Sequence, residues 1–78
     1  MSHHLKHEAA EVRASGQRME IYSFIADFYW KKKYAPTYGE IAEGTGVKPG
    51  TVRARLLEMQ QDGDVDWIFG RTRTVHIR

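Results

Sequence analysis

Hydrophobic residues recur along the chain with two different spacings, and the change between them divides it into predicted helices and a predicted hairpin. From residue 17 to residue 62 apolar side chains recur every three or four residues, as on one face of a helix. After Gly63 apolar and polar residues alternate, as in a half-buried strand. The pattern predicts a mainly α fold with a small β-hairpin (α+β), in which three helices precede two strands.

The first predicted helix covers residues 17–34 and is expected to supply the largest share of the core. The residue before a proline avoids the helical region, so Pro36 predicts the end of this helix. Its apolar face is formed by four residues: Ile21, Phe24, Ile25 and Phe28.

The first sixteen residues have a weaker helical pattern. Their few apolar residues are followed by Ser15-Gly16, a dipeptide that predicts a break. We therefore expect a flexible or weakly helical segment over residues 1–16, followed by one domain over residues 17–78. Histidines 3, 4 and 7 have the spacing of metal ligands on a helix. A mobile segment lacks further groups to orient them, so no metal site is predicted.

The second predicted helix starts at a capping box and ends at glycine. Thr37 is followed three residues later by Glu40, so the hydroxyl and the carboxylate can each satisfy a free amide at the helix start. Gly44 and Gly46 predict its end, because glycine adopts the left-handed conformation of helix C-termini without a steric penalty. This helix is expected to be about two turns long.

The third predicted helix, over residues 49–62, has one apolar face and one basic face. Pro49 favours a first helical turn, where its missing N–H costs nothing. The apolar face carries Val52, Leu56 and Met59 at positions i, i+4 and i+7. The opposite face has no carboxylate before residue 58 and carries four polar or basic side chains: Lys48, Thr51, Arg53 and Arg55. Two helices joined by a tight turn, with a basic second helix, are typical of a helix-turn-helix.

The alternating segment over residues 65–77 is expected to form a wing. Val65, Trp67, Val75 and Ile77 fall on one face of the predicted hairpin, which must pack on the helices because two strands alone are unstable. Gly70 supplies the turn conformation, and Arg71 and Arg73 lie at or beside the tip. The predicted architecture is a three-helix winged helix-turn-helix.

Composition narrows the function classes. The chain has 78 residues, a formal net charge of +2 and no cysteine, so it predicts one small domain without disulfides or thiolate metal sites. No apolar run approaches the roughly 18 residues of a membrane span. We expect a cytoplasmic, nucleoid-associated protein that has no membrane partner and no cofactor. No catalytic constellation or phosphate-binding loop is evident, because Gly44-Thr45-Gly46 lacks the lysine and the spacing of a P-loop. An enzyme is therefore not expected.

From Gln17 to Ile77 the sequence resembles the N-terminal DNA-binding domain of LexA-type repressors. The most specific match is the run Pro-Thr-x-x-Glu-Ile-Ala at residues 36–42, and Val52, Leu56 and Met59 also fit. The resemblance implies that the start of the third helix reads base edges and that the wing at residues 70–73 lies along the DNA backbone. The implied base-reading positions are Lys48, Gly50, Thr51, Arg53 and Ala54. LexA-type helices carry acidic and amide groups where this chain has Gly50 and Arg53, so no operator sequence is implied.

The predicted function is sequence-specific binding of double-stranded DNA by a repressor-like transcriptional regulator. We expect helix 49–62 in the major groove, with Arg53 on guanine and Thr51 on a thymine methyl group or a phosphate. The wing at residues 65–77 is expected on the backbone, with Arg71 and Arg73 on a flanking phosphate, or in the minor groove. A single small module buries little DNA, so tight binding would require a homodimer on DNA or a neighbouring domain. The predicted contact residues are Thr37, Tyr38, Lys48, Gly50, Thr51, Arg53, Ala54, Arg55, Arg71 and Arg73. The alternative is a winged-helix module that binds protein through exposed aromatic residues and the acids near residue 64.

Overall fold

The protein folds as three helices and a two-stranded antiparallel sheet. The structure is a computed structural model that describes the backbone of residues 2–78 and the side chains from residue 10 onward. The histidines near the N-terminus lie outside the side chains described. The elements are α1 (Ser2–Lys32), α2 (Tyr38–Thr45), α3 (Pro49–Gln61), β1 (Val65–Asp66) and β2 (His76–Ile77). Val65 pairs with Ile77 and Asp66 with His76, which confirms the predicted winged helix-turn-helix.

Helix α1 is longer than predicted at its N-terminus and shorter at its C-terminus. It runs through Ser15 and Gly16 without interruption, so the predicted break was wrong. The helix continues because the domain holds this part of it: Ala14 is buried, and Gln17 bonds to the third helix. The division at residue 16 stays a prediction. The other end comes at Lys32, because Lys33 adopts a left-handed backbone with φ of 66°.

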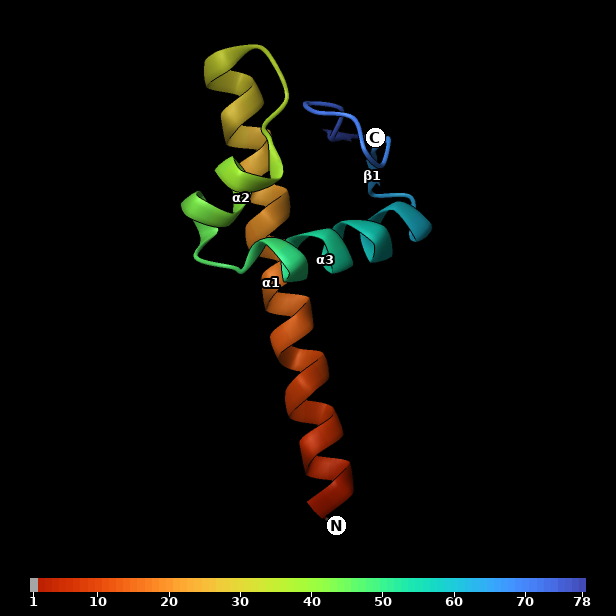
Figure 1. The fold of residues 1–78 in the computed structure, drawn as a ribbon. Coiled ribbons are helices and arrows are strands. Elements are labelled where there is room, and N and C mark those ends of the chain that lie inside the picture. Colours follow the sequence, from red (N-terminus) through yellow and green to blue (C-terminus); the bar gives the residue numbers. More distant parts are fainter. Residues whose placement is uncertain (1) are drawn as a thin grey trace.

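The core forms where α3 crosses α1, with α2 and the strands closing it (Figure 1). Ile21 and Ile25 of α1 are buried as predicted, whereas Phe24 and Phe28 are only partly buried. The hairpin buries its predicted inward face against the helices, since Val65, Trp67 and Val75 are buried and Ile77 partly so. The remaining buried apolar side chains come from α2, α3 and the turn between them: Ile41, Val47, Val52, Leu56 and Met59.

The predicted starts of α2 and α3 are confirmed. The Glu40 amide donates to Thr37 Oγ1 at 3.1 Å, and the Thr37 amide donates to Glu40 Oε1 at 2.8 Å, which completes the capping box of α2. Gly46 ends α2 with φ of 76° and donates its amide to the Ala42 carbonyl. Pro49 opens α3 directly after Lys48, the N-cap.

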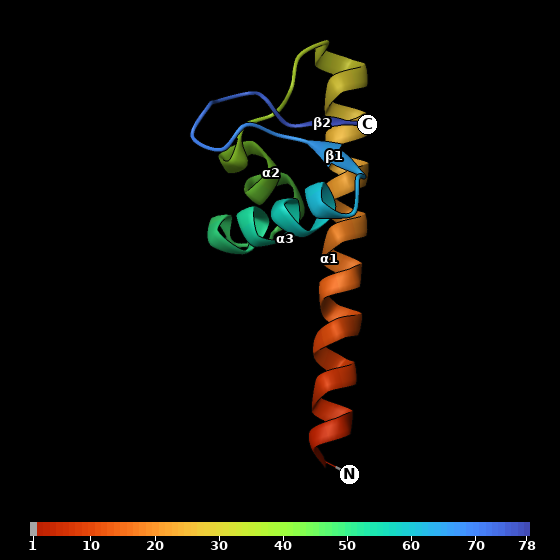
Figure 2. The same cartoon turned by 90° about the vertical axis from the view of Figure 1, so that its right-hand side faces the viewer.

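Much of the domain lies on one side of α1. Figure 2 shows α2, α3 and the loop between the strands extending to the same side, while the N-terminal half of α1 projects away from the domain. The start of α3, the start of α2 and the loop therefore lie on the side remote from α1.

Candidate nucleic-acid interface

The start of α3 presents its predicted contact residues to solvent. Val52, Leu56 and Met59 are buried against the core, and this fixes the opposite face of the helix outward. Four of the predicted residues on that face are exposed and Thr51 is half-buried; the exposed ones are Lys48, Gly50, Arg53 and Ala54. The structure thus brings these five positions together on one surface.

Arg53 is supported by the wing. Its guanidinium carbon lies 5.4 Å from the centroid of the Phe69 ring, which is the geometry of a cation–π contact. Phe69 is 65% exposed and packs edge-on against Trp67 at 5.7 Å. The side chain of Arg53 therefore extends over an aromatic platform that joins α3 to the wing.

A cleft separates the start of α2 from the wing loop. It has a volume of about 290 Å³ and is lined by Pro36, Thr37, Tyr38 and Gly39 on one side and by residues 70–73 and 75 on the other. Arg71 is exposed at its wing side. Within the described part of the chain, the amides of Tyr38 and Gly39 donate to no acceptor, as expected for the first turn of a helix. Amides at a helix start and a facing arginine suit an anion such as phosphate.

A family comparison identifies a fold with this arrangement. The family model of the LexA DNA binding domain matches residues 14–74. The chain belongs to this family. A search of curated proteins gives no match. The LexA-type domain indicates that the chain binds double-stranded DNA and has a regulatory role, and the family is one of binding domains rather than enzymes.

Two predicted contact residues of this LexA-type domain are engaged within the fold at the start of α2. Thr37 Oγ1 accepts the Glu40 amide, so the hydroxyl retains its proton and one lone pair for another partner. The Tyr38 hydroxyl is buried without a hydrogen-bond partner among the described residues, and its ring packs edge-on against Trp67 at 5.7 Å. Tyr38 thus offers a ligand its backbone amide, not its hydroxyl.

Arg73 ties the wing to α2. Its guanidinium donates to the two carboxylate oxygens of Glu40, at 2.9 and 3.3 Å, and to the Ala35 carbonyl at 3.0 Å. The guanidinium carbon also lies 4.7 Å from the centroid of the Tyr34 ring. The Thr37 amide, and after it Arg73, hold the pKa of Glu40 below its ordinary value of 4.5. Arg73 adopts a left-handed backbone with φ of 59°, which directs its side chain toward the helices.

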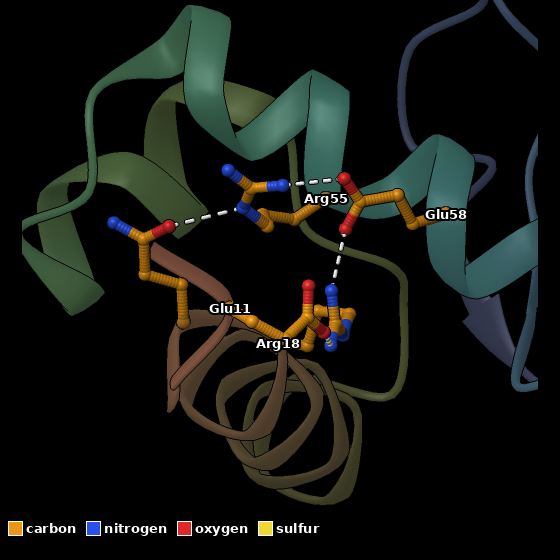
Figure 3. A network of polar contacts seen from close by, with 5 residues as sticks. Glu11, Arg18, Arg55 and Glu58 are labelled. Atoms are coloured by element: carbon orange, nitrogen blue, oxygen red, sulfur yellow. Dashed lines mark hydrogen bonds and ion pairs between the residues drawn. The ribbon is translucent and has the colours of Figure 1, made fainter. Parts of the chain in front are cut away.

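Arg55 ties α3 to α1. It donates to Gln17 Oε1 at 3.0 Å and forms an ion pair with Glu58 one turn later (Figure 3). Glu58 also accepts from Arg18 of α1 at 2.7 Å, and this bond raises the pKa of the Arg18 guanidinium. The first carboxylate of α3 is therefore paired with two arginines, which keeps its charge from opposing the basic start of the helix.

Two features of the site were missed in the sequence. They are the contact of Phe69 with Arg53 and the ion pair of Glu40 with Arg73. Glu40 and Arg73 are 33 positions apart, and no local pattern links them. The exposed aromatic beside Gly70 was the available signal for Phe69, since a wing tip seldom needs a large apolar side chain.

The described residues contain no cluster of metal-binding side chains and no helix that could span a membrane. Among the residues whose side chains are described, no three acidic or histidine side chains gather as metal ligands. No described helix combines the length and apolarity needed to cross a membrane.

Proposed function

We propose that the protein is a sequence-specific repressor that binds duplex DNA through the start of α3, the start of α2 and the wing loop. The observation that carries the proposal is that these three elements lie on one side of a LexA-type domain (Figure 2). Their exposed residues include three cations, namely Lys48, Arg53 and Arg71. The acid of α3, Glu58, is paired with Arg18 and Arg55. A repressor of this kind acts by occupying its operator.

Base reading is assigned to α3. The guanidinium of Arg53 lies over the exposed Phe69 ring and can make two parallel hydrogen bonds to guanine O6 and N7. Thr51 contacts a thymine methyl group or a phosphate, and Gly50 and Ala54 allow the helix backbone to approach the groove closely. Lys48, the N-cap of α3, is assigned to a flanking phosphate.

Phosphate binding is assigned to the cleft between α2 and the wing. The free amides of Tyr38 and Gly39 lie at the N-terminus of α2, the positive end of its helix dipole. Arg71 lines the opposite wall of the cleft. A phosphate held between them would fix the register of α3 on the duplex.

Arg55 and Arg73 are assigned to positioning rather than to DNA contact. Each is held by a carboxylate and by an uncharged acceptor of another segment, namely Gln17 for Arg55 and Ala35 for Arg73. Their guanidinium groups would have to leave these partners to reach a phosphate. We propose that they set the angles of α3 and of the wing.

Selection of binding sites from a random duplex library tests the proposal. The wild type is expected to enrich a motif containing guanine, and Arg53→Ala is expected to lose preference at that base, at a cost of about 1–3 kcal/mol. Arg78→Ala removes an exposed arginine that pairs with Asp66 outside the interface and serves as the control. Folded wild type that enriches no motif, or Arg53→Ala that enriches the same motif equally, would contradict the proposal.

A further inference from the structure

The face of α1 opposite the core carries an uncovered apolar stripe. Val12, Met19 and Trp30 are 72%, 69% and 75% exposed, although each is large and apolar. Together with Gly16, Ser23 and Ala26 they form a series whose members are alternately four and three positions apart, which is the spacing of a coiled-coil seam. The outward stripe is defined by Val12, Gly16, Met19, Ser23, Ala26 and Trp30, of which Ala26 is half-buried beside β2 and the others are exposed. Helices α2 and α3 and the loop between the strands extend from the other side of α1, while β2 crosses beside the C-terminal half of α1 (Figure 2).

Gly16 lies in this stripe, and no contact with the described residues requires a glycine there. A Cβ added there would meet nothing within 4 Å. Glycine in a helix interior costs about 1 kcal/mol relative to alanine, so the position sacrifices helix stability without a contact that requires it. Close approach of a second helix is a contact that would require it.

We propose that the outward stripe pairs two copies of this chain through antiparallel α1 helices. In the register that places Val12 opposite Ser23, Met19 of one copy lies opposite Gly16 of the other. Each large side chain then meets a small one. A parallel pair in register would instead place Met19 against Met19 and Gly16 against Gly16, which leaves a gap beside a crowded layer.

Charge complementarity selects the same antiparallel register. Arg13 and Glu20 directly follow Val12 and Met19, and both side chains are exposed. No ion pair joins either of them to another side chain described in the structure. In this antiparallel register the position after Val12 in one helix lies beside the position after Met19 in the other, so Arg13 of each copy faces Glu20 of its partner. The dimer therefore contains two equivalent attractive pairs.

Pairing through the outward stripe does not compete with the proposed DNA interface. The stripe lies on the face of α1 opposite the buried Ala14, Ile21 and Ile25. The start of α3 and the wing loop extend from the side of α1 that packs on the core (Figure 2). The match to the LexA-type family begins at residue 14, so the stripe extends beyond the part that the family defines. The proposal stands on α1 alone and is tested separately from DNA binding.

Sedimentation equilibrium over a concentration series tests self-association. Wild type is expected to dimerise, and Met19→Lys is expected to weaken association at least about tenfold because it places a charge in the seam. Ala10→Lys is the matched control, since Ala10 is exposed one turn before the buried Ala14, on the opposite side of the helix. Circular dichroism checks that each variant is folded. Wild type that remains monomeric to about 1 mM would overturn the proposal.

A charge exchange tests the register. Arg13→Glu and Glu20→Arg are each expected to weaken the dimer about tenfold, because each turns two attractive pairs into repulsive ones. The double variant restores opposite charges and is expected to recover wild-type association. A double variant as weak as either single one would contradict this register.

Disulfide trapping tests the orientation, and the chain has no native cysteine to interfere. Val12→Cys with Ser23→Cys is expected to form a covalent dimer on oxidation. Val12→Cys alone is not, because the two copies of residue 12 are separated by about 16 Å along the helix axis, beyond the reach of a disulfide of about 7 Å. Efficient dimerisation of the single variant would show a parallel pair and overturn the proposal. If Met19→Lys is monomeric and still binds DNA, self-association through α1 and DNA binding by the domain are independent properties.

Discussion

The guanidinium of Arg73, on the wing, donates to the two carboxylate oxygens of Glu40 in α2 at 2.9 and 3.3 Å. Glu40 simultaneously accepts the Thr37 amide that caps the same helix. One carboxylate thus completes a capping box and fastens the wing loop beside the helix start. This double role holds together the two walls of the cleft assigned to phosphate binding.

Removal of Arg73 is expected to loosen the wing more than removal of its neighbour Arg71. Arg73→Ala should lower the free energy of unfolding by about 1 kcal/mol, since it loses a partly exposed bidentate pair and a bond to Ala35. Arg71→Ala should change it by less than about 0.5 kcal/mol. Urea denaturation measures both. A double-mutant cycle with Glu40→Gln should show a favourable coupling between the two side chains, and additive effects would show that the pair contributes nothing.

The same carboxylate predicts a response to acid. The folded-state pKa of Glu40 lies below its ordinary value of 4.5, because the Thr37 amide and then Arg73 stabilise the charged form. The stability that it contributes is therefore complete above about pH 4.5 and is lost as the pH falls through the lower folded-state pKa. Thermal melts from pH 6 to pH 3 should show wild type and Glu40→Gln converging in Tm. A constant difference in Tm over this range would exclude the mechanism.

Glu58 is expected to hold α3 against α1. Glu58→Gln weakens its bonds with Arg18 and Arg55 together, and should lower the free energy of unfolding by about 1 kcal/mol (Figure 3). Glu43→Gln changes an exposed acid of α2 that has no ion pair among the described residues, and should have little effect. Equal stability of the two variants would show that the network does not fasten the helices.

Gly44 is expected to be the most sensitive glycine of α2. A Cβ at this position would lie 2.0 Å from Phe24 Cε2 and within 2.8 Å of two further ring atoms, so the ring must move. Gly44→Ala should destabilise the domain by about 1–3 kcal/mol, despite the better helix propensity of alanine. Gly39→Ala is the control in the same helix, because its nearest neighbour would be Thr37 Oγ1 at 3.9 Å. Comparable stability of the two variants would mean that Phe24 moves away at little cost.

Helix caps and burial periodicity were predictable from the sequence because they depend on neighbours within one or two turns. Thr37 and Glu40 are three positions apart, and Val52, Leu56 and Met59 recur within one helix, so their roles follow from local spacing. The break at Gly16 was predicted from the low helix propensity of glycine. Burial of Ala14 and the bond from Arg55 to Gln17 override that propensity, and both depend on tertiary packing.

The candidate site was only partly predictable. The exposed positions of α3 follow from its buried face, so Lys48 and Arg53 could be located before the fold was known. The partners of Arg55 and Arg73 could not, since Gln17 and Glu40 are 38 and 33 positions away. A cation in a basic segment looks the same in the sequence whether it faces DNA or a carboxylate of its own chain.

The salt dependence of binding to duplex DNA tests the central claim most directly. Fluorescence anisotropy with a labelled random duplex would follow affinity from about 50 to 200 mM salt for wild type, Lys48→Ala, Arg71→Ala and Arg55→Ala. Binding should weaken steeply with salt, with a slope about one unit shallower for Lys48→Ala and Arg71→Ala, each of which loses a phosphate contact. Arg55→Ala should keep the wild-type slope, because its guanidinium is held by Gln17 and Glu58. Folded wild type that does not bind duplex DNA at 50 mM salt, or a slope that changes only for Arg55→Ala, would contradict the assigned interface.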